Sequence, residues 1–165
     1  MKTTKIYLAH ALTDASELFR LRMFALRAAL NRIENVKVLE FNWKPGLGPD
    51  PKVNTYTHDM KQVRAADLMV AVVDYFSSGV GMEIKERCHI KAPLLCFTRP
   101  DMKIPQIVRD CIAYHRSLLP PEQDTLPDFI PYGGDDEIVF AVADWIKTHP
   151  PKELDLAQRP AQHLS

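Results

Sequence analysis

The chain has 165 residues, of which 46% are hydrophobic, and this length and composition fit one globular domain with its own core. Its 21 basic and 21 acidic residues cancel, so the charge balance argues against a polymeric nucleic acid as partner. No apolar run approaches the length of a membrane span, and the N-terminus leads into a predicted strand instead of a secretory signal. We therefore expect a cytoplasmic protein that does not bind membranes.

Strands and helices alternate in the first part of the chain. Residues 5–10 are predicted to form a strand, and an amphipathic helix is expected from about Asp14, as N-cap, to Ile33. A second strand is predicted at residues 36–41. The following segment, 42–55, is rich in Pro and Gly and too long for an ordinary connection, so it is a candidate lid or substrate loop, or else a disordered segment.

The alternation continues to the end of the predicted domain. A helix is expected at 56–66, followed by a strand at 68–73 whose unbroken apolar residues are typical of a strand buried on both faces. Further elements are predicted in the order helix 81–90, strand 93–98, short helix 104–111, strand 112–115 and helix 137–147. The segment 118–135 is a long loop that would suit a dimer contact or a second lid, and 150–165 is a predicted flexible tail.

Five strands that alternate with helices predict a single α/β domain over residues 1–149, flavodoxin-like and doubly wound, with a mostly parallel sheet in the order 2-1-3-4-5. In that order ligands bind beyond the carboxyl ends of the first and third strands. The fold should therefore bring His10 and Asp74 close to Glu83, with Tyr7 just beneath them.

The stretch from Asp74 to Glu83 is the strongest functional signal. Gly79 and Gly81 follow two serines, and we expect them to permit positive φ and to expose amides that form an anion-binding concavity. Glu83 is expected in the first helical turn, where the macrodipole favours an ionised carboxylate and suits a nucleophile. Each residue also has a structural interpretation, since Glu83 and Ser77 occur commonly at helix starts and the glycines can simply turn the chain.

Three blocks of sequence resemble segments of one known family, in the same order and at the same spacing. They are KIYLA, HDMKQVRAADLMVAVVD and SSGVGMEIKERCHIKAPLLCFTRP, and from the first to the last they extend over residues 5–100. The family is that of the nucleoside 2-deoxyribosyltransferases and their relatives that hydrolyse the N-glycosidic bond of nucleoside 5'-monophosphates. The resemblance implies that Glu83 is the nucleophile, Asp59 an acid of the sugar and base pocket, Tyr7 a wall of that pocket and Asp67 structural.

Ser77 separates the two branches of this family. The transferases resemble one another in having Asp six residues before the glutamate, whereas the monophosphate hydrolases have Ser, as here. A hydroxyl beside glycine amides can donate to a phosphate that an Asp would repel. The resemblance thus implies hydrolysis of (2'-deoxy)nucleoside 5'-monophosphates to free base and (deoxy)ribose 5-phosphate, without a cofactor, in a homodimer or higher homo-oligomer. Thr13 and Pro105 depart from the hydrolases, which have Arg and Ser there.

Several alternatives remain open from the sequence. Base exchange between deoxynucleosides is the second reading, a non-catalytic nucleotide-binding protein is the third, and a flavin carrier is a further one. Asp59 can orient Glu83, bind a sugar hydroxyl or protonate the departing base. His10, which stands where the family usually has Gly, can bind phosphate, assist protonation of the base or fill space. The three cysteines are odd in number and lack CxxC spacing, which favours buried thiols over disulfides or a metal site.

Overall fold

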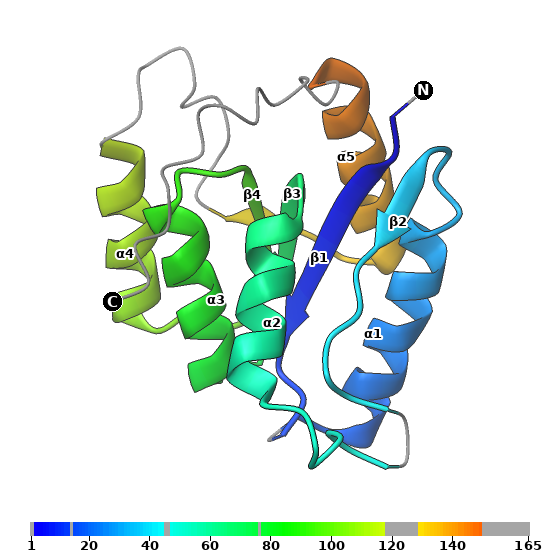
Figure 1. Cartoon of the computed structure of the whole chain (residues 1–165). Helices are drawn as coiled ribbons and strands as arrows, with labels where there is room; N and C mark the ends of the chain where they lie inside the picture. The colour runs from blue at the N-terminus through cyan, green and yellow to red at the C-terminus, as the bar shows by residue number, and fades with distance from the viewer. Residues whose placement is uncertain (1, 14, 45–46, 76, 118–128, 150–165) are drawn as a thin grey trace, which may run out of the picture.

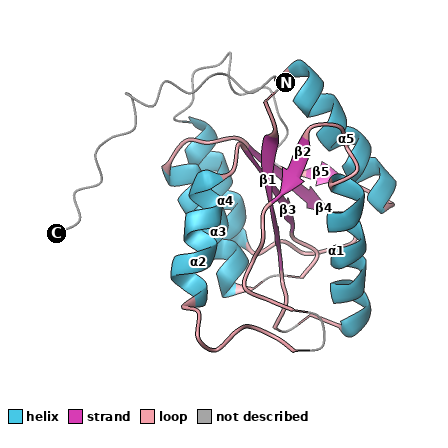
Figure 2. Cartoon of the chain, turned by 45° about the vertical axis from the view of Figure 1, so that its right-hand side comes forward, coloured by secondary structure: helices cyan, strands magenta, loops and turns pink. Residues whose placement is uncertain are grey.

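The computed structural model describes residues 2–13, 15–44, 47–75, 77–117 and 129–149. Within them a parallel sheet of five strands, in the order β2-β1-β3-β4-β5, lies between two layers of helices (Figures 1 and 2). The predicted α/β fold and its strand order are confirmed. The elements are β1 (Thr4–His10), α1 (Glu17–Leu30), β2 (Val36–Val38), α2 (Thr55–Ala65), β3 (Leu68–Val72), α3 (Ser78–His89), β4 (Leu94–Thr98), α4 (Gln106–Ser117), β5 (Ile130–Pro131) and α5 (Asp135–Thr148).

The two helix layers create two hydrophobic cores, one on each face of the sheet. Figure 2 shows α2, α3 and α4 on one face and α1 and α5 on the other. Every residue of β3 is buried, as expected for a strand covered on both sides. Alternation along β1 sends Tyr7 and Ala9 to the core under α2, α3 and α4, and Ile6 and Leu8 to the core under α1 and α5.

The helix α3 begins earlier than predicted. Its N-cap is Ser77, whose Oγ accepts a hydrogen bond from Val80 N at 3.2 Å, so the cap moves the helix start to Ser78 instead of Gly81. Gly79 and Gly81 consequently lie inside the first turn. The expectation of positive φ at these two glycines is wrong, because among the described glycines only Gly48 has it.

The last predicted strand is also wrong. Residues 112–115 belong to α4, which buries Val108 and Ile112 at helical i, i+4 spacing against the core beside α3. The fifth strand is instead the two-residue β5, which pairs with Phe97 and Thr98. Pro131 is acceptable there because β5 is an edge strand, where one side of the backbone needs no ladder partner. Of the predicted loop 118–135, residues 118–128 lie outside the described part of the chain.

Other boundaries differ by a few residues, and α1 is shorter at both ends. Its N-cap is Ser16, and the predicted cap Asp14 lies outside the described residues. It ends at Leu30 because Asn31 caps it and accepts a hydrogen bond from Val38 N at 2.8 Å, which ties the helix end to β2. The predicted tail, 150–165, also lies outside the described residues.

Two further predictions concern the cysteines and membrane-spanning helices. Cys88, Cys96 and Cys111 form no disulfide with one another, and the first two are buried, as predicted. No helix in the described ranges is both long and apolar enough to cross a membrane.

Candidate active site

Glu83 is a buried acid that accepts a hydrogen bond from Tyr7 of the strand β1. It lies in the second turn of α3 and its exposure is 8%. The hydroxyl of Tyr7, in the middle of β1, donates to Glu83 Oε1 at 2.6 Å. Among the described residues no hydrogen bond reaches Oε2, so this oxygen is the one left for a substrate. Tyr7 itself is 1% exposed and holds the acid from below.

The environment of Glu83 favours its neutral form. Burial raises the pKa of Glu83 to about 8, the hydrogen bond from Tyr7 opposes this rise, and the nearby Asp59 adds to it. Burial likewise raises the pKa of Tyr7 well above its usual value, helped by Glu83 and Asp59. The expected first-turn stabilisation of an ionised Glu83 is therefore wrong, because α3 starts too early for it and desolvation dominates.

Asp59 comes from the first half of α2 and lies close enough to influence both Glu83 and Tyr7. Its Oδ1 accepts the backbone N–H of Asn42 at 3.1 Å and contacts Nδ1 of His58 at 2.9 Å. Asp59 is not a helix cap, since Asn54 caps α2 with its own side chain. The predicted adjacency of the α2 and α3 acids is thus present.

Asn42 organises the loop that precedes α2. Its amide nitrogen donates to Asp50 O and Val53 O, both at 3.4 Å, and to Thr55 Oγ1 at 2.8 Å, while its Oδ1 accepts from Asp50 N at 3.1 Å. The described parts of the predicted lid segment therefore fold around one side chain. Because the same residue donates its backbone N–H to Asp59, the loop and the acid are positioned together.

The N-terminus of α3 faces the same edge of the sheet as the carboxyl end of β1 (Figure 1). Ser77 Oγ accepts from Val80 N, and Ser77 O accepts from Gly81 N at 3.1 Å. The Gly81 amide is therefore part of the helix and is not the free anion donor that was expected. Gly79 is exposed, and an added Cβ there meets only Ser77 Oγ, at 3.7 Å.

His10 is buried in an aromatic environment and does not reach Glu83 by any hydrogen bond in the described structure. Its Nδ1 lies 3.2 Å from Ala11 O, its ring meets Phe19 and Phe41 edge-on, and its Nε2 is buried without a partner among the described residues. Burial lowers the pKa of His10 to about 4, the Ala11 carbonyl opposes this shift and Arg27 adds to it. A neutral imidazole does not suit an electrostatic contact to phosphate.

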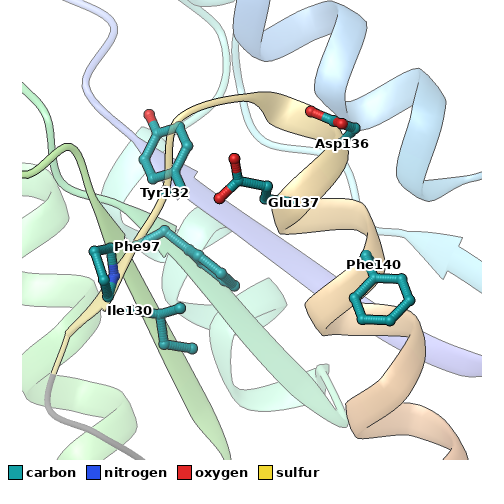
Figure 3. Close-up of a pocket in the computed structure, with 7 residues that line it drawn as sticks. Phe97, Ile130, Tyr132, Asp136, Glu137 and Phe140 are labelled. Atoms are coloured by element: carbon teal, nitrogen blue, oxygen red, sulfur yellow. The ribbon is translucent and has the colours of Figure 1, made fainter.

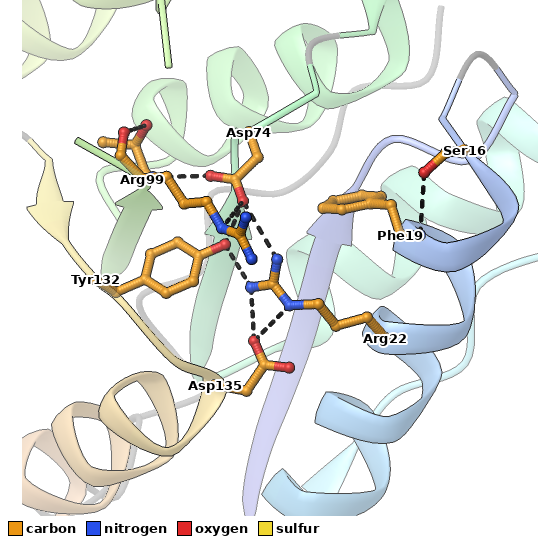
Figure 4. Close-up of polar contacts among 8 residues, drawn as sticks. Ser16, Phe19, Arg22, Asp74, Arg99, Tyr132 and Asp135 are labelled. Atoms are coloured by element: carbon orange, nitrogen blue, oxygen red, sulfur yellow. Dashed lines mark hydrogen bonds and ion pairs between the residues drawn. The ribbon is translucent and has the colours of Figure 1, made fainter. Parts of the chain in front are cut away.

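Asp74, expected beside Glu83, instead belongs to a separate polar network (Figure 4). It accepts from Arg99 N at 2.9 Å and from the Tyr132 hydroxyl. Arg22 donates to Tyr132 OH and to Asp135 Oδ1, both at 2.6 Å, and lies 3.6 Å from Asp74. This network joins α1, β5 and the start of α5 to the end of β3, so Asp74 acts as a structural anchor for the loop that leads to Ser77.

A hollow of about 550 Å³ lies between the edge strand β5 and the helix α5, and Glu83 is not among the residues that line it (Figure 3). It is mostly apolar, and its charged residues are Asp136 and Glu137, of which Glu137 already accepts the backbone N–H of Gly133 at 3.2 Å. Both of these acids are exposed and no basic group lines the hollow, so it is a weaker candidate for catalysis than the environment of the buried Glu83. The other residues that line it are Phe97, Ile130, Pro131, Tyr132 and Phe140.

The sequence reasoning missed Asn42 and His58, the two residues that hold Asp59. Neither has a motif of its own, although His58 directly precedes Asp59 within the second family-like block. In the described ranges no group of three His, Cys, Asp or Glu side chains is arranged to hold a metal ion.

Comparison with known proteins supports the fold and nothing finer. No family model and no curated protein matches the sequence. A crystal structure of a conserved protein from Enterococcus faecalis V583 is similar, with a TM-score of 0.54 and 16% identity. The match covers 86% of this chain and 98% of that one. The chain therefore shares its α/β architecture with a solved structure.

Proposed function

We propose that this protein hydrolyses the N-glycosidic bond of (2'-deoxy)nucleoside 5'-monophosphates and releases the free base and (deoxy)ribose 5-phosphate. The observation that carries the proposal is the contact of Tyr7 with Glu83 Oε1, beside Asp59. This pairing of a positioned carboxyl group and a second acid is the arrangement that glycosidic bond cleavage uses.

The chemistry requires a negative group close to C1' of the sugar. Breaking the bond to the base builds oxocarbenium character there, and an ionised Glu83 stabilises that charge and can bond to the carbon. In the free protein the raised pKa of Glu83, about 8, favours the neutral form at pH 7. The developing positive charge and the donor hydrogen of Tyr7 both favour the ionised form, so activity should rise with pH through about 8.

The start of α3 is the proposed place for the 5'-phosphate. Ser77 Oγ already accepts from Val80 N, and its own hydrogen remains able to donate. The amide of Gly79 lies in the first turn, where helix N–H groups have no partner within the helix. With two such donors and the N-terminus of a helix, a charge-assisted contact of roughly 1.5–3 kcal/mol is reasonable.

The test is a panel of nucleosides and their 5'-monophosphates, incubated with the protein and assayed for free base. Monophosphates should be cleaved with the higher kcat/KM, and Glu83→Ala should reduce turnover by at least about several hundredfold. A parent protein that releases no base, or a folded Glu83→Ala variant with parent activity, contradicts the proposal.

Selectivity for phosphate is tested by Ser77→Asp. Asp is also a good N-cap, so α3 should be retained, while its carboxylate repels the phosphate and can accept from a 5'-hydroxyl. Monophosphate cleavage should fall by about one to two decades and nucleoside cleavage should fall less. An equal loss on both substrates contradicts the placement of the phosphate.

The second candidate is a nucleoside 2-deoxyribosyltransferase, which uses the same carboxylate and hands the sugar to another base. Adding a free base to the assay distinguishes the two, because only a transferase forms the exchanged nucleoside.

We also propose that the working unit is a homodimer. A protein that is monomeric by light scattering and still fully active would contradict this proposal.

A further inference from the structure

His58 is a further ionisable side chain beside the proposed site, and the mechanism so far does not use it. It lies in the first turn of α2, next to Asp59 in the chain, and 29% of its side chain is exposed. Nδ1 lies 2.9 Å from Asp59 Oδ1. A carboxylate in that position favours the tautomer that carries hydrogen on Nδ1, which directs proton exchange to Nε2.

Nε2 of His58 is engaged by none of the described residues, and the ring is open to solvent on one side. A histidine held at one nitrogen by a carboxylate, with the other nitrogen free, is the arrangement found behind acid–base catalysts. The carboxylate that holds His58 also adds to the rise that burial causes in the pKa of Glu83, so Asp59 is close to both the histidine and the proposed nucleophile.

The other proton carriers near Glu83 are less suitable as the acid. Tyr7 is 1% exposed and already donates to Glu83. Asp59 Oδ1 accepts from Asn42 N–H and faces Nδ1 of His58, so that oxygen has no proton to give. His10 faces Ala11 O with Nδ1, and its ring is enclosed by Phe19 and Phe41.

We propose that His58, held by Asp59, is the catalytic acid that protonates the departing base, an inference that rests on the proposed function. In the first step His58 is the imidazolium, with hydrogen on both ring nitrogens. The C1'–N bond breaks, its electron pair goes to the base, the base takes the proton from Nε2 and leaves a neutral His58 with hydrogen on Nδ1, and the Glu83 carboxylate bonds to C1'. In the second step water attacks C1', Glu83 leaves as a carboxylate, and the proton of the water returns to Nε2. The sum is nucleotide plus water to base plus sugar phosphate.

The test compares substrates that differ in their need for a proton. A neutral purine nucleotide must gain a proton as its base departs, whereas the N7-methylated nucleotide already carries a positive charge on the base and departs without one. The two variants are His58→Gln and His58→Asn. The Asn amide can still donate to Asp59 where Nδ1 does, but neither variant has a proton to transfer. His89→Gln, on the exposed end of α3, is the matched control.

With both His58 variants, kcat for the neutral purine nucleotide should fall by about 10²–10⁴-fold, while kcat for the N7-methylated nucleotide should fall by less than about tenfold. His89→Gln should change neither. Equal losses on the two substrates, or parent activity in His58→Asn, would show that His58 only supports the structure and would overturn the inference. A parent protein that cleaves neither nucleotide contradicts the proposed function itself, which separates the two failures.

Discussion

Glu83 and Arg87 lie one turn apart on α3 and are both buried, but they differ in how many hydrogen bonds the surrounding residues make to them. The guanidinium of Arg87 donates to four carbonyl oxygens at the end of α2 and the start of β3 and β4, namely those of Val63, Ala66, Asp67 and Pro93, at 2.8–3.0 Å. Glu83 has a single hydrogen bond among the described residues, from Tyr7.

The difference shows which buried charge belongs to the structure. Burial lowers the pKa of Arg87 only to about 10, with Asp67 opposing the shift, so Arg87 stays charged at neutral pH. Burial raises the pKa of Glu83 to about 8, so much of it is neutral there. A buried group without full compensation costs stability, and such groups concentrate at functional sites. We therefore assign Glu83, near the carboxyl ends of the strands, to the candidate site. Arg87, which binds carbonyl groups near the amino ends of β3 and β4, has a structural role.

The largest expected effect tests the structural member of this comparison. Arg87→Met removes the guanidinium donor from four backbone carbonyl groups, of which those of Val63 and Ala66 are buried, so the free energy of unfolding should fall by at least about 3 kcal/mol. Urea unfolding measures it. The control Arg64→Met removes only the surface ion pair with Glu86 and should cost less than about 1 kcal/mol. Similar losses in the two variants would remove the distinction.

Substitution of Glu83, the functional member of the comparison, should increase stability at high pH instead of lowering it. The pKa of Glu83 is raised in the folded state, so its contribution to stability is complete below about pH 4.5 and is lost as the pH rises through about 8. Glu83→Gln removes that titration. Relative to the parent, the variant should therefore gain on the order of 3 kcal/mol in unfolding free energy between pH 5 and pH 8.5, while losing activity. A pH-independent difference between the two proteins would argue against a buried, titrating Glu83.

Tyr7→Phe sharpens the comparison by removing the one hydrogen bond that favours the ionised form of Glu83. The pKa of Glu83 should rise above about 8, and the acidic limb of kcat/KM should move by about one pH unit to higher pH. Activity at pH 7 should fall by about tenfold and should recover partly at high pH. An unchanged pH profile would show that Tyr7 has no influence on the reacting acid.

The smallest expected effect comes from Gly79→Ala. The added Cβ meets only Ser77 Oγ at 3.7 Å and stands in a helical turn, so stability should change by less than about 1 kcal/mol. If a phosphate approaches the Gly79 amide, KM for monophosphates should rise while nucleoside cleavage stays unchanged. If Gly79→Ala had the same KM as the parent for both monophosphates and nucleosides, the phosphate would not bind at the Gly79 amide.

Much of the fold follows from local patterns in the chain. The unbroken apolar run of β3 predicted a strand covered on both faces, and the alternation of elements predicted the strand order. The start of α3 was missed because Ser77 caps the helix before the two glycines, and a Ser-Ser-Gly sequence is equally typical of a turn. The strand β5 was missed because two residues carry no period, whereas residues 112–115 contain enough apolar side chains to suggest one.

The candidate site divides in the same way. The amino-acid order alone was sufficient to place Glu83 near the start of a helix after a buried strand, with Asp59 on the preceding helix, because periodicity and spacing are properties of short segments. The raised pKa of Glu83 came only from the assembled fold, since it depends on burial and on Tyr7, 76 residues away in the chain. The convergence of Asn42 and His58 on one oxygen of Asp59 is also a tertiary result. Desolvation and hydrogen bonds over such separations exist only after the sheet has brought the elements together.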